Sequence, residues 1–252
     1  MDEPISYRIR PLDAVRALRA SFKDPDDTAE VVRIIDALSG KSGVRLLERF
    51  LAAPGSRAIV ARDRTILEVL QDRDALAAMP VGSLGRTYFD FTAAEKISAD
   101  GLVEATREAA GYDEAEQDDV YGWYMERLRD THDLWHVLTG YGRDLLGEAA
   151  LLSFSYAQTR HHGFGFIVGS VYLRTFFPGA PTPVLRIPGV KARTRAMIRH
   201  GWRRGRASEW LPGQDWEALL SEPVEELRER LAISEPPVYE PVRSIGAPVL
   251  AG

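Results

Sequence analysis

Three side chains that can bind a metal ion fall within five residues of the sequence, namely His132, Asp133 and His136. On an α-helix, which turns by about 100° per residue, the two histidines lie about 40° apart around the axis and Asp133 lies within the same quarter of the circumference. All three then project to one side of the helix. This spacing predicts one half of a metal site, although histidine pairs at this spacing also occur as hydrogen-bonded core residues.

A fourth candidate ligand comes from the segment that follows. Gly140 and Gly142 can end the first helix, because glycine tolerates the left-handed conformation found at many helix C-termini, and Asp144 is a suitable N-cap for a second helix. Glu148 follows just past the first turn and is the only charged side chain in 145–159. A lone buried carboxylate is costly unless a cation or donor meets it. A short antiparallel helix pair therefore predicts that Glu148 returns toward the histidines.

Two imidazoles and two carboxylates form a hard-to-borderline set of donors. Such a set suits Zn, Mn, Fe, Co or Mg better than copper. Two histidines with one carboxylate are also the facial arrangement used by oxygen-activating Fe(II). The chain has no cysteine, which excludes disulfides, iron–sulfur clusters and thiolate zinc sites.

The order and spacing of these residues resemble the signature of a known family. Two residues separate Asp133 from His136, and eleven separate His136 from Glu148. This order and spacing are similar to the H-D-x-x-H-x(11)-E motif of the coenzyme Q biosynthesis protein 4 family. Residues 145–148 resemble its L-L-G-E, and 80–88 its P-x-G-x-x-G-R-x-Y loop. The likeness covers about residues 30–235, and the sequence is identified as a bacterial-type member.

The resemblance implies a mostly helical fold with a divalent metal on His132, Asp133, His136 and Glu148, which are also the expected catalytic residues. It further implies a role in ubiquinone biosynthesis at the membrane surface, beside other quinone-biosynthesis enzymes. Three functions stay open. The first is metal-dependent oxidative decarboxylation of a polyprenylated hydroxybenzoate, in which a hydroxyl replaces the ring carboxylate. The second is a non-catalytic isoprenoid- or lipid-binding scaffold. The third is a metal-dependent hydrolase, for which the sequence offers no Gly-rich phosphate loop and no recognisable Ser–His pair.

Three further side chains are candidates for binding the substrate. Arg129 precedes His132 by one turn and could steer the ring carboxylate, or form a structural salt bridge with Glu126 or Asp133. Phe164 and Phe166 lie in a glycine-interrupted apolar run that could line a groove for the isoprenoid tail. Because apolar stripes are usually core, internal packing of this run is the alternative.

The charge distribution indicates an anionic partner. No acidic residue occurs between Glu148 and Glu209, and this stretch carries a charge of +10, which leaves −15 for the remainder of the chain. An anionic membrane surface, an acidic protein or a carboxylate or phosphate ligand would suit it. A solvated face balanced by acids from other segments is the alternative. Nucleic acid is not expected, because the stretch has no recognition motif. A homodimer is possible.

Membrane contact is expected to be peripheral. The apolar run 163–173 spans eleven residues, whereas a membrane-spanning helix needs about 20. The N-terminus lacks the basic and apolar regions of a secretory signal. Together with the resemblance, this predicts a cytoplasmic protein peripheral to the inner membrane.

Apolar residues recur at helical spacing along the chain, and no strand-like alternation is convincing, which predicts an all-α fold. We expect one helical domain, 1–233, and an extended proline-rich tail, 234–252. Loops are expected at 80–85 and 178–190. The expected helices lie near 13–22, between Thr28 and Leu38, between Ser42 and Pro54, near 64–78, 100–110, 114–138, 145–162 and 190–206, and after Ser221.

Overall fold

The computed structural model describes residues 8–23, 27–97, 120–177, 183–235 and 237–243. Within these residues the fold is all-α, as predicted, and the only bridge of the β type is an isolated one between Ser83 and Pro223. The helices are α1 (Pro11–Ser21), α2 (Thr28–Ala37), α3 (Gly40–Leu51), α4 (Ser56–Val60), α5 (Ile66–Gln71), α6 (Arg73–Ala78), α7 (Leu84–Glu95), α9 (Val120–Asp130), α10 (His132–Thr139), α11 (Leu145–Thr159), α12 (His162–Arg174), α13 (Val190–Ala207), α14 (Trp216–Leu219) and α15 (Val224–Arg230), with short 3-10 turns at Pro183–Arg186 and Leu211–Gly213.

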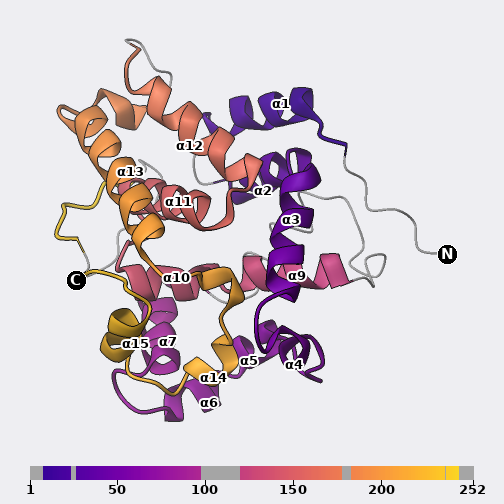
Figure 1. The fold of residues 1–252 in the computed structure, drawn as a ribbon. Helices are drawn as coiled ribbons and strands as arrows, with labels where there is room; N and C mark the ends of the chain where they lie inside the picture. Colours follow the sequence, from indigo (N-terminus) through magenta and orange to yellow (C-terminus); the bar gives the residue numbers. More distant parts are fainter. Residues whose placement is uncertain (1–7, 24–26, 98–119, 178–182, 236, 244–252) are drawn as a thin grey trace.

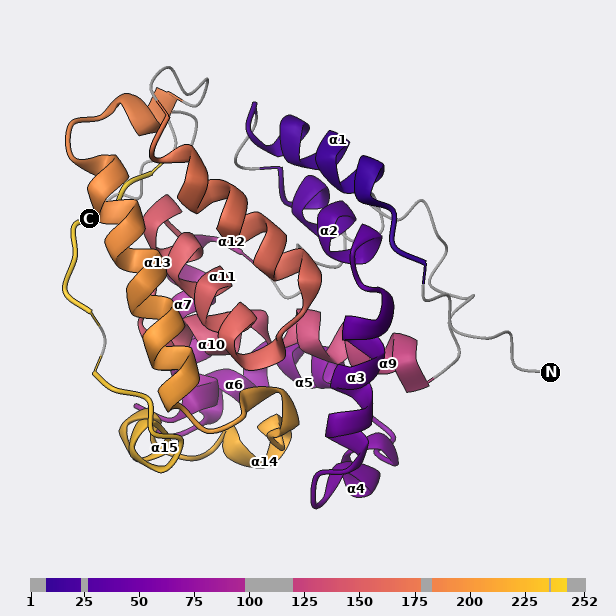
Figure 2. The same ribbon diagram turned by 45° about the horizontal axis from the view of Figure 1, so that its top comes forward.

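Helices α9 and α10 run end to end across the middle of the molecule (Figure 1). On one side lie α11, α12 and α13, and on the other lie the shorter helices α5, α6, α7, α14 and α15. Figure 2 shows α12 between the α1–α2 pair and α13. Helix α10 thus contacts both halves of the molecule.

The closest helix pair is α11 with α13. A Cβ atom added at Gly201 would lie 2.0 Å from the carbonyl oxygen of Ala150, so only glycine permits this approach. Two side chains of α11 bond the α13 backbone: Ser153 Oγ donates to the Ile198 carbonyl at 2.7 Å, and Gln158 Nε2 donates to the Gly205 carbonyl at 2.6 Å. The basic segment is therefore anchored to the helix that carries Glu148.

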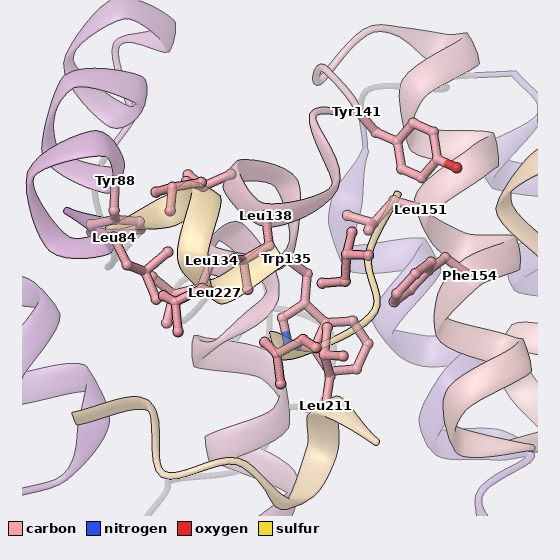
Figure 3. Close-up of a cluster of buried hydrophobic side chains, with 14 of the residues drawn as sticks. Leu84, Tyr88, Leu134, Trp135, Leu138, Tyr141, Leu151, Phe154, Leu211 and Leu227 are labelled. Carbon is pink, nitrogen blue, oxygen red and sulfur yellow. The ribbon is translucent and has the colours of Figure 1, made fainter. Parts of the chain in front are cut away.

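The largest hydrophobic cluster surrounds α10 (Figure 3). Leu134 and Leu138 are fully buried, and Trp135 is almost so. They pack with residues of α7, α11 and α15, including Leu84, Leu151 and Leu227. One face of α10 is thereby held in the core, which fixes the rotation of the face that carries the candidate ligands.

Several predicted boundaries are wrong. The single helix predicted from 114 to 138 is two helices, α9 and α10, which are divided at Thr131. The helix predicted over 145–162 ends at Thr159, since Arg160 adopts a left-handed conformation. The segment 64–78 forms α5 and α6, separated at Asp72.

Four helices were not anticipated, namely α4, α7, α12 and α14. Helix α7 begins at Leu84, within the segment 80–85 that was predicted to be a loop, because Ser83 is its N-cap and the Ser83 Oγ accepts a hydrogen bond from the Arg86 amide. The last helix begins after Pro223 rather than at Ser221. The described part of the tail contains no helix, as expected. The helix predicted at 100–110, and residues 114–119, lie outside the described residues.

Candidate metal centre

The turn between α10 and α11 has the predicted local geometry. Gly140 ends α10 with a φ of 68°, and its amide donates to the His136 carbonyl at 2.8 Å. Asp144 caps α11, since its Oδ1 accepts from the Leu146 amide at 3.0 Å. These two caps close a short hairpin that turns α11 back toward α10.

Two arginines far away in the sequence hold the C-terminal end of α10. Arg228 donates from Nε to the Leu138 carbonyl at 2.9 Å and from Nη2 to the Val137 carbonyl at 3.0 Å. Arg204 donates from Nη1 to the Thr139 carbonyl at 2.8 Å. Positive charge at a helix C-terminus is favourable, because the last carbonyl groups have no partner within the helix.

Three candidate ligands converge on one point. His132, Asp133 and His136 each offer a donor atom, and these atoms all lie within 4.8 Å of one another. The imidazole rings of His132 and His136 meet edge to face, with 4.7 Å between their centroids. Nδ1 of His132 lies 3.3 Å from Oδ1 of Asp133. The helix spacing thus places all three side chains together.

The hairpin brings Glu148 to His136. Its Oε1 lies 3.4 Å from His136 Nε2, although Glu148 is not within the compact group of three. His136 is buried, whereas Glu148 and His132 are half-buried. The four residues therefore line a site that is closed on the His136 side and open on the other.

The hydrogen bonds of His136 define its protonation. Nδ1 lies 2.8 Å from the Tyr141 carbonyl oxygen, which can only accept, so Nδ1 carries a proton. In the neutral imidazole, Nε2 then presents a lone pair, and this buried atom has no hydrogen-bond partner among the described residues. It faces a carboxylate oxygen, which is also a lone-pair donor. A divalent cation fits between such groups, and ligating histidines usually bond a carbonyl through their other nitrogen in this way.

The electrostatics of the site favour positive charge. Burial by itself lowers the pKa of His136, but the nearby carboxylates of Glu148 and Asp133 raise it above its ordinary value. Burial by itself raises the pKa of Asp133 and of Glu148, but the two histidines and the charge of Arg143 hold both below their ordinary values. The carboxylates are thus ionised and attract a cation.

Phe91 of α7 is a site residue that sequence reasoning missed. Its ring stacks against the imidazole of His136, with 5.8 Å between centroids and an angle of 24° between planes. Like Arg204 and Arg228, it comes from a distant part of the chain. Neither the spacing of apolar residues nor any local motif identifies such a neighbour.

Arg129 lies at the end of α9, one turn before His132. Its Nε donates to Asp130 Oδ1 at 2.7 Å, so the structure pairs it with its direct neighbour rather than leaving it isolated in the site. Its predicted role toward a substrate carboxylate stays a prediction.

Phe164 and Phe166 lie on α12. Phe164 meets His161 edge to face, with 5.6 Å between centroids. Phe166 packs against the cluster formed by α1, α2 and α12. Neither of these contacts involves the four candidate ligands. The apolar run is thus a half-buried helix, and the binding of an isoprenoid tail by the two rings stays a prediction.

The basic stretch is less uniform than its sequence indicates. Arg204 belongs to the stretch for which an anionic partner was expected, but it is buried, and its guanidinium donates to the carbonyls of Thr139 and Ser234. Arg193 pairs with Glu240 at 3.3 Å. Arg199 and Arg203 are exposed. Part of the positive charge is therefore internal.

The fold brings one serine and one histidine together, at a place that the sequence did not indicate. His161 Nε2 lies 3.1 Å from Ser39 Oγ, from a part of the chain 122 residues away. However, His161 Nδ1 accepts from the Gly163 amide at 3.2 Å, so Nε2 carries the proton and donates to the serine. This histidine cannot activate Ser39 as a nucleophile.

Within the described residues, no helix is long and apolar enough to cross a membrane.

Comparisons with known proteins agree on one family. The model of the coenzyme Q (ubiquinone) biosynthesis protein Coq4 family matches residues 9–237. The mitochondrial ubiquinone biosynthesis protein COQ4 of Yarrowia lipolytica is 31% identical over 198 residues, which cover 77% of this chain and 67% of that protein. The mitochondrial protein coq4 of Aspergillus fumigatus is 30% identical over 249 residues, covering 96% of this chain and 79% of the other.

A solved structure shares the fold. It is a crystal structure of a protein from Nostoc punctiforme described as a putative ubiquinone biosynthesis protein, with a TM-score of 0.61 and 22% identity. The match covers 89% of this chain and 97% of that one. Since the family model spans nearly the whole chain and the predicted signature converges in space, the chain belongs to the Coq4 family of coenzyme Q (ubiquinone) biosynthesis proteins.

Proposed function

We propose that this protein acts in ubiquinone biosynthesis as a metal-dependent enzyme that removes the carboxylate of a polyprenylated hydroxybenzoate oxidatively and leaves a hydroxyl in its place. Family membership supports the pathway. The observation that carries the metal is the buried Nε2 of His136, which has no hydrogen-bond partner in the part of the chain that the structure describes and faces Glu148 at 3.4 Å. In the overall reaction the ring carboxylate leaves as CO2 and one atom of O2 becomes the ring hydroxyl, while the other atom is reduced to water with two protons and two electrons from an external reductant.

His132, Asp133, His136 and Glu148 would hold the ion. A divalent ion of the Zn, Fe, Mn, Co or Mg type held there would act as a Lewis acid toward the substrate. His136 keeps its Nδ1 proton on the Tyr141 carbonyl, which orients the ring. The stacked ring of Phe91 and the burial of His136 exclude water from one side of the site. The half-buried side, with His132 and Glu148, is where a substrate would enter.

The substrate would extend from this site along α11. Leu152 lies one turn after Glu148 on the same face of α11 and packs against the cluster that includes Phe166. An apolar path therefore leads from the carboxylate toward α12, and we assign the isoprenoid tail to it, with Phe164 and Phe166 along its course. We assign the ring carboxylate to the neighbourhood of Arg129, which would exchange its bond to Asp130 for the substrate.

The membrane-facing part of this proposal is the junction of α12 and α13. Leu173, Phe176 and Phe177 are 61%, 58% and 64% exposed. Basic side chains lie directly beside them, since Lys191 Nζ donates to the Phe177 carbonyl at 2.8 Å and Arg195 lies over the ring of Phe176. Exposed aromatic rings next to cations suit an anionic lipid surface. We propose that this junction docks the protein peripherally on the cytoplasmic side of the inner membrane, beside other quinone-biosynthesis enzymes.

The activity is tested with purified protein loaded with one metal at a time. The protein is incubated under air with a prenylated hydroxybenzoate and a chemical reductant, and mass spectrometry follows loss of the carboxylate and gain of oxygen. Asp133→Asn is the matched inactive variant, because it removes one charge with almost no change of shape. Turnover by the native protein but not by the variant supports the enzyme. Absence of turnover with Fe, Mn, Co and Zn alike would favour the scaffold.

The membrane contact is tested separately by co-sedimentation with vesicles that contain or lack anionic lipid. Phe177→Ser should reduce binding to the anionic vesicles. Val81→Ser is the control, because Val81 is 88% exposed but lies in the loop before α7. Equal binding of both variants would contradict the assigned surface.

A further inference from the structure

The C-terminal segment 237–243, which we call the strap, lies over the turn between α10 and α11. The Leu145 amide donates to the Val242 carbonyl at 2.9 Å, and the Gly142 amide donates to the Tyr239 hydroxyl at 2.9 Å. The side chain of Val242 is buried in the main core. A segment that sequence analysis treated as a loose tail is therefore attached to the hairpin of the candidate metal centre.

Asp144 is the centre of this attachment. It is 3% exposed and accepts three hydrogen bonds. One comes from its own helix, the Leu146 amide at 3.0 Å. The other two come from the strap, the Tyr239 hydroxyl at 2.6 Å and the Val242 amide at 2.9 Å. Since an ionised carboxylate is costly to bury without donors, the cap of α11 depends on the strap.

This cap lies one turn from Glu148. The Glu148 amide donates to the Asp144 carbonyl at 2.8 Å, so a shift of Asp144 moves the backbone that carries the carboxylate. Gly147 packs under the strap, where an added Cβ would lie 2.6 Å from the Tyr239 hydroxyl. Tyr239 therefore limits where the first turn of α11 can lie, and with it the distance from Glu148 to His136.

The strap has few other attachments. A cavity of about 450 Å³ lies between it and the hairpin, lined among others by Glu95, Arg143 and Arg243. Arg243 pairs with Glu95 at 3.4 Å, and Arg193 with Glu240 at 3.3 Å, and Arg193 Nη2 also donates to the Glu240 carbonyl; these contacts are at the surface. Exposed pairs of this kind contribute little. The strap is therefore held in place mainly by its hydrogen bonds to Asp144 and by the burial of Val242.

We propose that the strap is a component of the metal centre, in which Tyr239 and Asp144 are positioning residues that hold Glu148 at ligating distance from His136. This inference rests on the metal-binding part of the proposed function. It assigns the C-terminal segment a role that the four-residue signature does not contain. The ion would bind fully only when the strap is docked.

The test compares Tyr239→Phe with Tyr172→Phe. Both remove one hydroxyl, and the Tyr172 hydroxyl meets Arg199 Nη1 at 3.4 Å on α13, away from the hairpin. Zn(II) affinity is measured by chelator competition, and Co(II) absorption reports the geometry and number of ligands. Circular dichroism and the thermal midpoint check that each variant is folded at the temperature used.

We expect Tyr239→Phe to bind Zn(II) about 10-fold more weakly, the lower end of the range for groups that support metal ligands. Its Co(II) spectrum should change, which a merely stabilising contact would not cause. Tyr172→Phe should match the native protein. If the native protein binds neither metal, the metal site itself is refuted. If the native protein binds and the two variants agree with it in affinity and spectrum, the metal site stands and the role of the strap is refuted.

Discussion

His136 and His161 are both buried, at 1% and 0% exposure, but their surroundings differ. His161 uses both ring nitrogens, one accepting from the Gly163 amide and the other donating to Ser39. His136 uses only Nδ1, and its Nε2 faces the Glu148 carboxylate. Around His161 no carboxylate is within ion-pair distance among the described residues, whereas His136 has two acidic groups in its field.

The difference teaches how a structural histidine is distinguished from a ligand. Burial and the charge of His162 lower the pKa of His161 to about 4, so it stays neutral and its hydrogen bonds are complete. His136 is placed so that a positive charge, whether a proton or a metal ion, completes its contacts. Burial alone does not separate the two roles, but the partner of the second nitrogen does.

The largest expected effect is a loss of metal affinity when the charge that faces His136 is removed. Glu148→Gln keeps the shape of the side chain but removes the charge that faces Nε2. We expect Zn(II) affinity to fall by more than the roughly 10–100-fold typical of groups that merely support a ligand. Chelator competition measures this. Glu229→Gln, an exposed change on α15, is the control and should bind like the native protein. Equal Zn(II) affinities for the two variants would contradict the assignment of His136 as a metal ligand and His161 as a structural residue.

The second prediction concerns pH and the His161 side. Because the folded protein disfavours protonated His161, the unfolded chain binds more protons between the ordinary pKa of about 6.5 and the folded value of about 4. The stability contributed by His161 is complete above about pH 6.5 and is lost as the pH falls toward 4, by up to about 3 kcal/mol.

The measurement is the free energy of unfolding by denaturant at pH 7, 5.5 and 4.5, with a chelator present. His161→Asn should be less stable than the native protein at pH 7 but should lose less stability on acidification. The difference between the two proteins cancels the titration of all other groups. A parallel loss in both would show that His161 is readily protonated in the folded state.

A smaller effect is expected from Ser39→Ala. The Ser39 hydroxyl contacts the Tyr121 hydroxyl at 2.6 Å and also His161 Nε2. Its removal leaves both of these atoms without this partner. We expect a loss of about 1–3 kcal/mol in the free energy of unfolding. Metal affinity should not change, because this cluster is separate from the hairpin. A metal-binding defect in Ser39→Ala would show that the two histidine clusters are coupled.

The smallest effect is expected at His162, which directly follows His161 but is exposed. His162→Gln should change the free energy of unfolding by no more than about 0.5 kcal/mol, as is usual for surface positions. Zn(II) stoichiometry should stay the same. A lower Zn(II) stoichiometry would indicate a second metal site at the start of α12. The region around His161 would then not be purely structural.

The sequence by itself determined the local part of the site. Helical periodicity places His132, Asp133 and His136 on one face, and the two caps, Gly140 and Asp144, define the hairpin that returns Glu148. These features depend on backbone geometry over a few residues, which amino-acid type and spacing encode directly. The division between α9 and α10 at Thr131 was missed, because the pattern of apolar residues gives no signal there.

Only the tertiary structure decided which groups complete each cluster. The Tyr239 hydroxyl donates to Asp144, which lies 95 residues earlier in the sequence, and Arg228 bonds the end of α10 over a separation of about 90 residues. Ser39 and His161 are in contact although 122 residues separate them in the sequence. Such contacts depend on how all the helices pack, including the close approach of α11 and α13. Sequence spacing carries no information about them, because the free energy that brings these segments together is spread over the whole core rather than over neighbouring residues.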